Sequence, residues 1–201
     1  MLEDRLLRLF LAGPLPAALQ ADVFAALGAA RRAASQARWV RPGQLHVTLA
    51  FFAKADPSDV SSLVAALRPL GLRHRGLSLD VRGAGCFGRP HQPELLYAKL
   101  SGDLGGLLAL HADVEASVAP LRQTPVGERS QPFHPHLTLA RARGRHGDAA
   151  LLRCQRALRE QPLGAFLLEH LVLFQSELKP TGPEHTALAE FPLGRADSAH
   201  P

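Results

Sequence analysis

The sequence predicts an α+β protein with two lobes, each built from one antiparallel sheet with helices, and an active-site cleft between the lobes. Segments with strand-like alternation and segments with helical periodicity follow one another along the chain of 201 residues. Their order then repeats. Each half offers a strand, a helix, a strand containing His-x-Thr-Leu, a second helix and paired strands, which indicates a duplicated unit with a pseudo-two-fold axis.

The first half begins with a predicted strand at residues 5–13. A helix follows, in which apolar residues recur every four positions, at Leu15, Leu19, Val23 and Leu27. The next strand is rich in β-branched and aromatic residues, and the next helix has Asp56 as its cap. The strand spans residues 44–53 and the helix residues 56–70. Two paired strands follow, at residues 76–87 and 94–100.

The second half repeats this order with a helix at 103–121, a strand at 134–142 and a helix at 148–160. Two further strands close the chain, and these are predicted at residues 165–178 and 185–193. We expect a single domain over residues 1–194, with residues 195–201 as a flexible tail.

Composition excludes several classes of protein. The apolar runs are too short to cross a bilayer, and Glu3 and Asp4 precede the first of them, which is unlike a signal peptide. Cys86 and Cys154 are too few for a disulfide framework and are expected to be buried thiols. We therefore expect a monomer in the cytoplasm that does not bind membranes.

The chain carries a net charge of +5, and arginines account for nearly all of its cations. The guanidinium group binds phosphate oxygens in a bidentate manner, so an arginine excess suits a phosphate-containing partner. A GC-rich genome would produce the same excess together with the many Ala, Gly and Pro residues. Charge alone therefore makes nucleic acid a plausible partner without identifying it.

Two short motifs carry the chemistry, "LHVTL" at residues 45–49 and "PHLTL" at 135–139. Side chains alternate across a strand, so His46 and Thr48 share one face, as do His136 and Thr138. If these two faces meet across the cleft, they bring together two imidazoles and two hydroxyl groups.

Strict alternation places the fifth residue after each motif histidine on the face opposite that histidine. Strict alternation turns Arg141 away from His136, so a bulge, a strand end or its long stem must bring it back. Alternation puts Phe52, and not Phe51, on the His46 face. A core position is the competing interpretation for both phenylalanines.

Two histidines suit the in-line cleavage of a phosphodiester. One imidazole deprotonates the attacking water, and the other protonates the departing alkoxide on the opposite side of phosphorus. Thr48 and Thr138 would donate hydrogen bonds to the non-bridging oxygens, and an arginine would balance their charge.

Two alternatives remain open. His134 lies two residues before His136, so these two and His46 could be ligands of a metal-dependent phosphohydrolase. The same residues could also belong to a non-catalytic module that binds RNA ends.

The twin His-x-Thr pattern resembles the two-histidine phosphoesterases, and in particular the bacterial RNA 2′,3′-cyclic phosphodiesterases, or 2′-5′ RNA ligase-like proteins. The resemblance covers nearly the whole chain, through "RLFLAGPLP", "LHVTLAFF", "PFHPHLTLAR" and "LVLFQSELKPTGPEHTALAEFPL". It implies a bilobal fold and hydrolysis of RNA 2′,3′-cyclic phosphate ends, or of small cyclic nucleotide phosphates, to a 2′-phosphate. No metal or other cofactor is implied, and 2′-5′ ligation would be a minor reverse reaction.

Carried over residue by residue, the resemblance implies that His46 is the proton donor and His136 the proton acceptor. It also implies that the substrate is bound by Thr48, Thr138, Arg141 and Phe51. Some positions depart from the family pattern or have no assigned role, namely His185 where Tyr is frequent, Glu94 and Tyr97 where a basic residue and Trp are common, and the cations Arg143 and Arg145.

Overall fold

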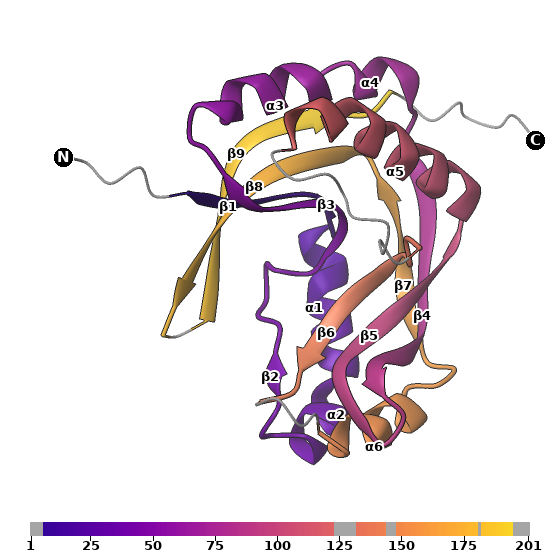
Figure 1. Cartoon of the computed structure of the whole chain (residues 1–201). Helices are drawn as coiled ribbons and strands as arrows, with labels where there is room; N and C mark the ends of the chain where they lie inside the picture. Colours follow the sequence, from indigo (N-terminus) through magenta and orange to yellow (C-terminus); the bar gives the residue numbers. More distant parts are fainter. Residues whose placement is uncertain (1–5, 123–131, 144–147, 181, 195–201) are drawn as a thin grey trace, which may run out of the picture.

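The computed structural model describes residues 6–122, 132–143, 148–180 and 182–194, so the predicted tail at 195–201 lies outside them. Among these residues, nine strands form one curved antiparallel sheet (Figure 1). Eight of the strands follow the order β7-β4-β5-β6-β3-β1-β8-β9, and the short β2 (Arg38–Trp39) pairs with β6. The predicted α+β class is confirmed.

The sheet divides into two groups of four strands, which we call the first and the second lobe. The first lobe contains β1 (Leu7–Pro14), β3 (His46–Ala55), β8 (His170–Lys179) and β9 (Gly182–Pro192). The second lobe contains β4 (Leu77–Arg89), β5 (Gln92–Gly102), β6 (His136–Arg141) and β7 (Pro162–Leu168).

The lobes join where β3 and β6 pair, with Val47 opposite Leu137. Both side chains are fully buried. Within the described residues this is the whole register of the pair, so the two strands diverge on either side of it and the sheet bends there. The two predicted lobes are thus the two halves of one curved sheet, which this bridge joins.

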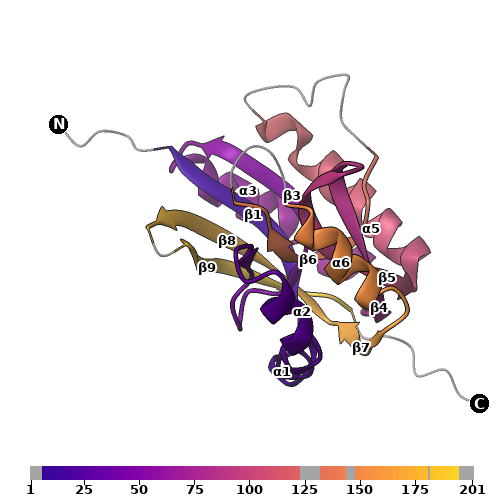
Figure 2. The same ribbon diagram turned by 90° about the horizontal axis from the view of Figure 1, so that it is seen from below.

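Each lobe is covered by helices on its outer face. Helices α1 (Ala17–Ala26), α2 (Gly28–Ala33) and α6 (Ala150–Ala157) lie together and cover the second lobe (Figure 2). Helices α3 (Asp59–Leu67), α4 (Leu70–Arg73) and α5 (Leu104–Val118) gather at the first lobe, and the 3₁₀ helix η1 (Ala119–Leu121) follows α5.

The two longest helices cross between the lobes. Helix α1 follows β1 of the first lobe but packs on β7 of the second, where Gly164 leaves room for the side chain of Leu19. Helix α5 follows β5 of the second lobe and packs on β3 of the first. Each lobe therefore takes part of its cover from the other half of the chain.

Aspartates fix the starts of two predicted helices. The Asp103 carboxylate accepts a hydrogen bond from the Gly106 amide at 2.8 Å, which caps α5. The Asp56 carboxylate accepts from the Ser58 amide, also at 2.8 Å, and closes the turn that leads into α3. Helix α3 begins three residues after Asp56, so this aspartate lies before the cap position itself.

The predicted repeat is visible as β1-α1-β3-α3 and β5-α5-β6-α6, with antiparallel pairing of the two strands in each unit. One predicted strand, residues 165–178, is wrong, because it is two strands separated by Glu169. The first, β7, pairs with β4 in the second lobe, and the second, β8, pairs with β1 in the first lobe. The chain must therefore cross between lobes at Glu169.

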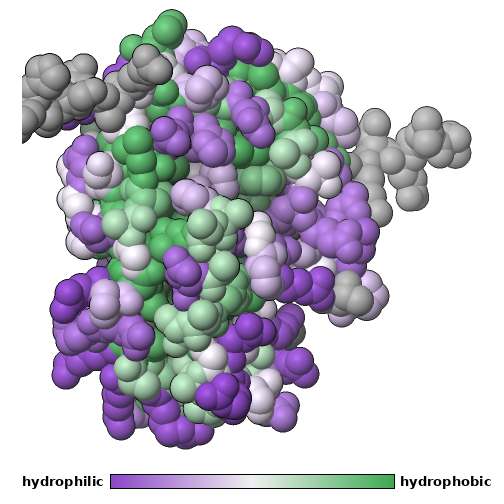
Figure 3. All heavy atoms as spheres, turned by 180° about the vertical axis from the view of Figure 1, so that it is seen from behind, coloured by the Kyte–Doolittle hydropathy of each residue, from purple (hydrophilic) through white to green (hydrophobic). Residues whose placement is uncertain are grey.

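Leucines dominate the buried core, which extends continuously beneath both lobes. Seen from behind, apolar residues gather across the middle of the molecule between more hydrophilic regions (Figure 3). Cys154 is buried as predicted, Cys86 is only partly buried, and both are free thiols. Among the described residues, no helix is long and apolar enough to cross a membrane.

Candidate functional site

The bridge between the lobes brings the two His-x-Thr motifs onto one face of the sheet. Val47 and Leu137 point into the core, so the histidines and threonines on either side of them point to the opposite face, where all four are partly buried. His46 and His136 flank this bridge diagonally, because the two strands run antiparallel and each histidine precedes the bridging residue of its own strand.

Each motif strand contains a β-bulge at the same position. In β3, Leu49 is the extra residue, because Thr48 lies opposite Ala12 and Ala50 lies opposite Leu11. In β6, Leu139 is the extra residue, because Thr138 lies opposite Tyr97 and Ala140 lies opposite Leu96. A bulge reverses the alternation beyond it, so the fifth residue after each histidine returns to the histidine face.

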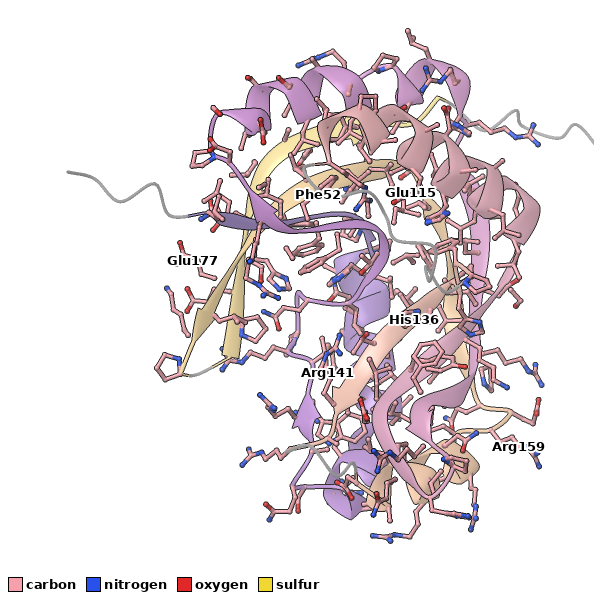
Figure 4. All side chains as sticks on the ribbon, viewed as in Figure 1. Phe52, Glu115, His136, Arg141, Arg159 and Glu177 are labelled. Carbon is pink, nitrogen blue, oxygen red and sulfur yellow. The ribbon has the colours of Figure 1, made fainter. Side chains whose placement is uncertain are left out.

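The bulge in β3 decides between the two phenylalanines. Phe51 lies opposite Phe10 on the His46 face and is 43% exposed. Phe52 is 8% exposed and lies on the side of the strand that α5 covers (Figure 4). The expectation from alternation that Phe52 shares the His46 face is therefore wrong.

The bulge in β6 does the same for Arg141, which lies on the same strand as His136 (Figure 4). Its charge lowers the pKa of both His46 and His136. Arg38, opposite Arg141 on β2, adds a second cation that sequence patterns did not indicate.

Both motif histidines are held by the same backbone interaction. His46 Nδ1 lies 2.7 Å from the carbonyl oxygen of Gln44, and His136 Nδ1 lies 2.7 Å from the carbonyl oxygen of His134. A carbonyl only accepts, so each Nδ1 carries the proton and donates it. In the neutral imidazole this leaves Nε2 as a proton acceptor.

Aromatic rings surround each of these histidines. The Phe10 ring centroid is 4.9 Å from that of His46, and the His185 ring lies 4.8 Å from Phe10 and 5.7 Å from His46. Around His136, the rings of Phe87 and Tyr97 lie at 5.1 and 5.4 Å. Sequence patterns gave no reason to separate Phe10 and Phe87 from core phenylalanines.

The surroundings favour neutral imidazoles in the free protein. Burial lowers the pKa of His46 to about 4, against the raising effect of its hydrogen bond to Gln44. Charges on His185, His136 and Arg141 lower it further. Burial is also the main reason that the pKa of His136 is lowered. Both histidines are therefore mostly uncharged near neutral pH in the free protein.

The alternative metal site receives no support from the positions of its ligands. The rings of His134 and His136 are 6.3 Å apart, and His136 Nδ1 is already bonded to the carbonyl of His134. Among the described residues, no three or more His, Cys, Asp or Glu side chains gather in a manner that could hold a metal ion.

Of the departures from the family pattern, His185 and Tyr97 lie at the site, each beside one motif histidine. Glu94 is exposed on β5, and Arg143 is exposed just beyond β6. Arg145 lies outside the described residues.

Comparisons with known proteins identify the family of this chain. Residues 15–180 match the family model of the 2′-5′ RNA ligase superfamily. A protein named RNA 2′,3′-cyclic phosphodiesterase from Aeropyrum pernix is 30% identical over 154 residues, which cover 75% of this chain and 83% of that protein. The protein of the same name from Thermus thermophilus is 31% identical over 161 residues, which cover 77% of this chain and 74% of that one.

Solved structures show the same fold. TT0787 of Thermus thermophilus superposes with a TM-score of 0.76 at 29% identity, covering 92% of this chain and 97% of its own. The apo form of E. coli LigT gives a TM-score of 0.71 at 22% identity, covering 95% of this chain and 99% of its own. The second likeness concerns the fold alone.

Proposed function

The chain belongs to the 2′-5′ RNA ligase superfamily, and from this premise we propose that it hydrolyses RNA 2′,3′-cyclic phosphate ends to 2′-phosphomonoesters. The relatives named RNA 2′,3′-cyclic phosphodiesterase support the choice of substrate. One observation carries the proposal. The bridge of Val47 and Leu137 brings two imidazoles from distant parts of the chain to one face, each with its Nε2 available for proton transfer.

In this proposal the cyclic phosphate binds between the two motif strands. The hydroxyl groups of Thr48 and Thr138 donate hydrogen bonds to the non-bridging oxygens, and the Arg141 guanidinium balances the charge that develops on them. The protein's own side chains supply every group that the reaction needs, so we propose that it uses no metal or other cofactor.

The chemistry is one in-line displacement with two proton transfers. His136 Nε2 takes a proton from water as the water oxygen attacks phosphorus, and His46 gives a proton to the 3′ oxygen as its bond to phosphorus breaks. The Nδ1 hydrogen bonds to the carbonyls of Gln44 and His134 hold both rings in the required orientation.

The low pKa of His46 requires that its proton arrives with the substrate. In the free protein the imidazolium is disfavoured by burial and by neighbouring positive charge. A bound phosphate anion supplies the opposite charge and raises the pKa of His46. We therefore propose that the cyclic phosphate and a proton bind together, which gives a donor that is acidic enough to protonate an alkoxide.

Phe51 is proposed to stack on the base of the terminal nucleotide, because its ring is exposed on the His46 face. The partners are then RNA ends or small cyclic nucleotide phosphates. We further propose that the protein acts as a monomer in the cytoplasm, as a single domain whose lobes share their helices. The two free thiols, Cys86 and Cys154, fit a reducing compartment.

Incubation of the protein with a short RNA that ends in a 2′,3′-cyclic phosphate, in excess EDTA, tests the proposal. We expect turnover and a product whose phosphate is on the 2′ oxygen. Loss of activity with EDTA, restored by added metal, would favour the metal-dependent alternative built on His46, His134 and His136. Tight binding without consumption of the RNA would favour a binding module. A product with a 3′-phosphate would contradict the proposed leaving group.

A further inference from the structure

A second aromatic ring lies beside the proposed general base. The Phe87 ring centroid is 5.1 Å from that of His136, with an angle of 86° between the ring planes. One face of Phe87 stacks on Tyr97 at 4.4 Å, and the edge-on ring of His134 lies at 5.3 Å. Phe87 nevertheless remains 36% exposed, although its ring lies beside His136.

The local backbone holds this ring in place. A Cβ atom at Gly85 would lie 2.4 Å from the Tyr97 ring, so the glycine lets Tyr97 lie flat against β4. Tyr97 is 7% exposed, and its ring stacks on one face of Phe87. Just after Phe87 the register of β4 and β5 shifts, at Gly88, whose φ of 110° is in the region that favours glycine. We call Phe87, Tyr97 and His134 the second-lobe platform.

Hydrolysis alone gives this platform no role. Water is small and needs no aromatic surface, and the base of the terminal nucleotide is already assigned to Phe51 in the first lobe. In an in-line displacement, the nucleophile approaches phosphorus from the side opposite the departing 3′ oxygen. His136 activates the nucleophile, so a ring beside His136 lies on the side from which the nucleophile enters.

We propose that the second-lobe platform is an acceptor subsite, which stacks the base of a nucleoside whose 5′-hydroxyl takes the place of water. This inference rests on the proposed function. The superfamily's name describes 2′-5′ ligation, and the inference assigns the acceptor nucleoside of that reaction to Phe87, Tyr97 and His134. The rigid, partly exposed ring is the feature that base stacking uses, and it accepts any base because every base has a π face.

The step balances in the same way as hydrolysis. The 5′ oxygen forms a bond to phosphorus while its proton passes to His136 Nε2. The bond between phosphorus and the 3′ oxygen breaks, and that oxygen takes the proton from His46. The product is a 2′-5′ phosphodiester with a free 3′-hydroxyl, and solvent returns both histidines to their starting protonation states. In the reverse direction, the platform would hold the nucleoside that leaves from a 2′-5′ linkage.

A partition experiment tests the subsite. The protein is given a 2′,3′-cyclic nucleotide phosphate together with a nucleoside that has a free 5′-hydroxyl, and the 2′-5′ linked product and the hydrolysis product are measured in the same tube. Their ratio depends only on how the two nucleophiles compete for one bound phosphate. We expect Phe87→Leu to lower this ratio by about 5- to 150-fold, the range for one base–aromatic stack.

Two matched variants sharpen the result. Phe87→Tyr keeps a ring and should keep the ratio near that of the unaltered protein. Phe51→Leu removes the first-lobe ring and should lower both products together, since both pathways share the bound cyclic phosphate. If a leucine at position 87 does not fold, the same ratio in Tyr97→Leu tests the platform through its support.

Three results would overturn the inference. The first is an unchanged ratio in Phe87→Leu, and the second is an equal loss of both products, because Phe87 would then only position His136. The third is hydrolysis by the unaltered protein with no 2′-5′ product at any nucleoside concentration, which would remove the acceptor subsite but leave the proposed function intact. Absence of hydrolysis itself would instead overturn the proposed function.

Discussion

The two motif strands, β3 and β6, have the same architecture and different surroundings. Both begin at the histidine, both bulge at the leucine three residues later, and both share one burial pattern up to the fifth position after the histidine. At that fifth position, however, β3 has Phe51 and β6 has Arg141. The duplicated backbone thus supplies two equivalent places, and single residues make one apolar and the other cationic.

The histidines themselves show the same contrast. Equal hydrogen bonds from Nδ1 to a carbonyl two residues earlier hold His46 and His136 alike, so the backbone does not distinguish an acid from a base. Their neighbours differ. His46 lies against Phe10 and His185, and its pKa is lowered to about 4. His136 instead lies beside His134, which is exposed. The surroundings therefore distinguish the two histidines, whereas the motif and its backbone hydrogen bonds do not.

Removing either motif histidine should have the largest effect. His46→Ala and His136→Ala should each lower the rate of cyclic phosphate hydrolysis by about 10²- to 10⁴-fold, because each removes one proton transfer. The double variant should be little worse than the weaker single variant, since the two groups act in one step. Steady-state kinetics on a 2′,3′-cyclic end measures this, and substantial residual activity in either single variant would contradict the two-histidine mechanism.

Arg141→Gln should come next, with a loss in kcat of about 10²- to 10³-fold, which is typical when one donor to a developing oxyanion is removed. The substitution keeps a polar side chain at the bulge in β6 but removes the charge. Arg143→Gln, two residues further along the chain, is the matched control and should change kcat much less. A loss confined to KM in Arg141→Gln would show that the guanidinium binds the ground state only.

Phe51→Leu should have a smaller effect, which falls on KM instead of kcat. Loss of the stacked ring should raise KM by about 5- to 150-fold and change kcat little, because stacking holds the nucleotide equally well before and during the reaction. Phe52→Leu is the control for volume loss in the same strand, and it should affect stability more than KM, since Phe52 belongs to the core. An unchanged KM in Phe51→Leu would exclude stacking at this position.

His185→Tyr should have the smallest effect on rate and a clear effect on titration. The positive charges that face His46 come from His185, His136 and Arg141. Removing the first of them should raise the pKa of His46 above about 4, although burial, the larger cause, should keep it below the usual value of 6.5. Histidine titration followed by NMR measures the shift.

The matched control is His134→Gln in the other lobe. The charge of His134 lowers the pKa of His136, so this change should raise the pKa of His136 and leave that of His46 in place. A downward shift of the pKa of His46 in His185→Tyr, or equal shifts of both histidines in both variants, would contradict the idea that His185 acts on His46 and His134 on His136.

Alternation was sufficient to predict that His46 shares a face with Thr48 and that His136 shares one with Thr138. Only the pairing of β3 with β6 shows that both pairs lie on the same face of the sheet. The sequence was not sufficient to predict the bulges, since an extra residue leaves no mark in a periodic pattern when its neighbours are also apolar. The one available signal is that Leu-Ala follows the threonine in both motifs, which places two buried residues in succession where a regular strand would alternate.

Other parts of the site could not be found in this way for different reasons. Strand β2 has only two residues, which is too short for any periodicity, so Arg38 had no predicted place. Phe10 and Phe87 occur in strands where core phenylalanines are common, and only the tertiary arrangement shows that their rings touch the motif histidines. The break between β7 and β8 at Glu169 arises because the two strands pair with β4 and β1 in different lobes, and strand order depends on the whole sheet.

The exchange of α1 and α5 between the lobes has a consequence for how such a duplicated protein can work. In a chain with only one half, part of the sheet would be exposed to solvent unless the helix of a second copy packed against it. The two copies would then be related by a true two-fold axis. Both histidines would be chemically equivalent in that assembly, and only the bound RNA could tell donor from acceptor. Fusing the halves into one polypeptide removes that constraint, so each side is free to acquire residues of its own.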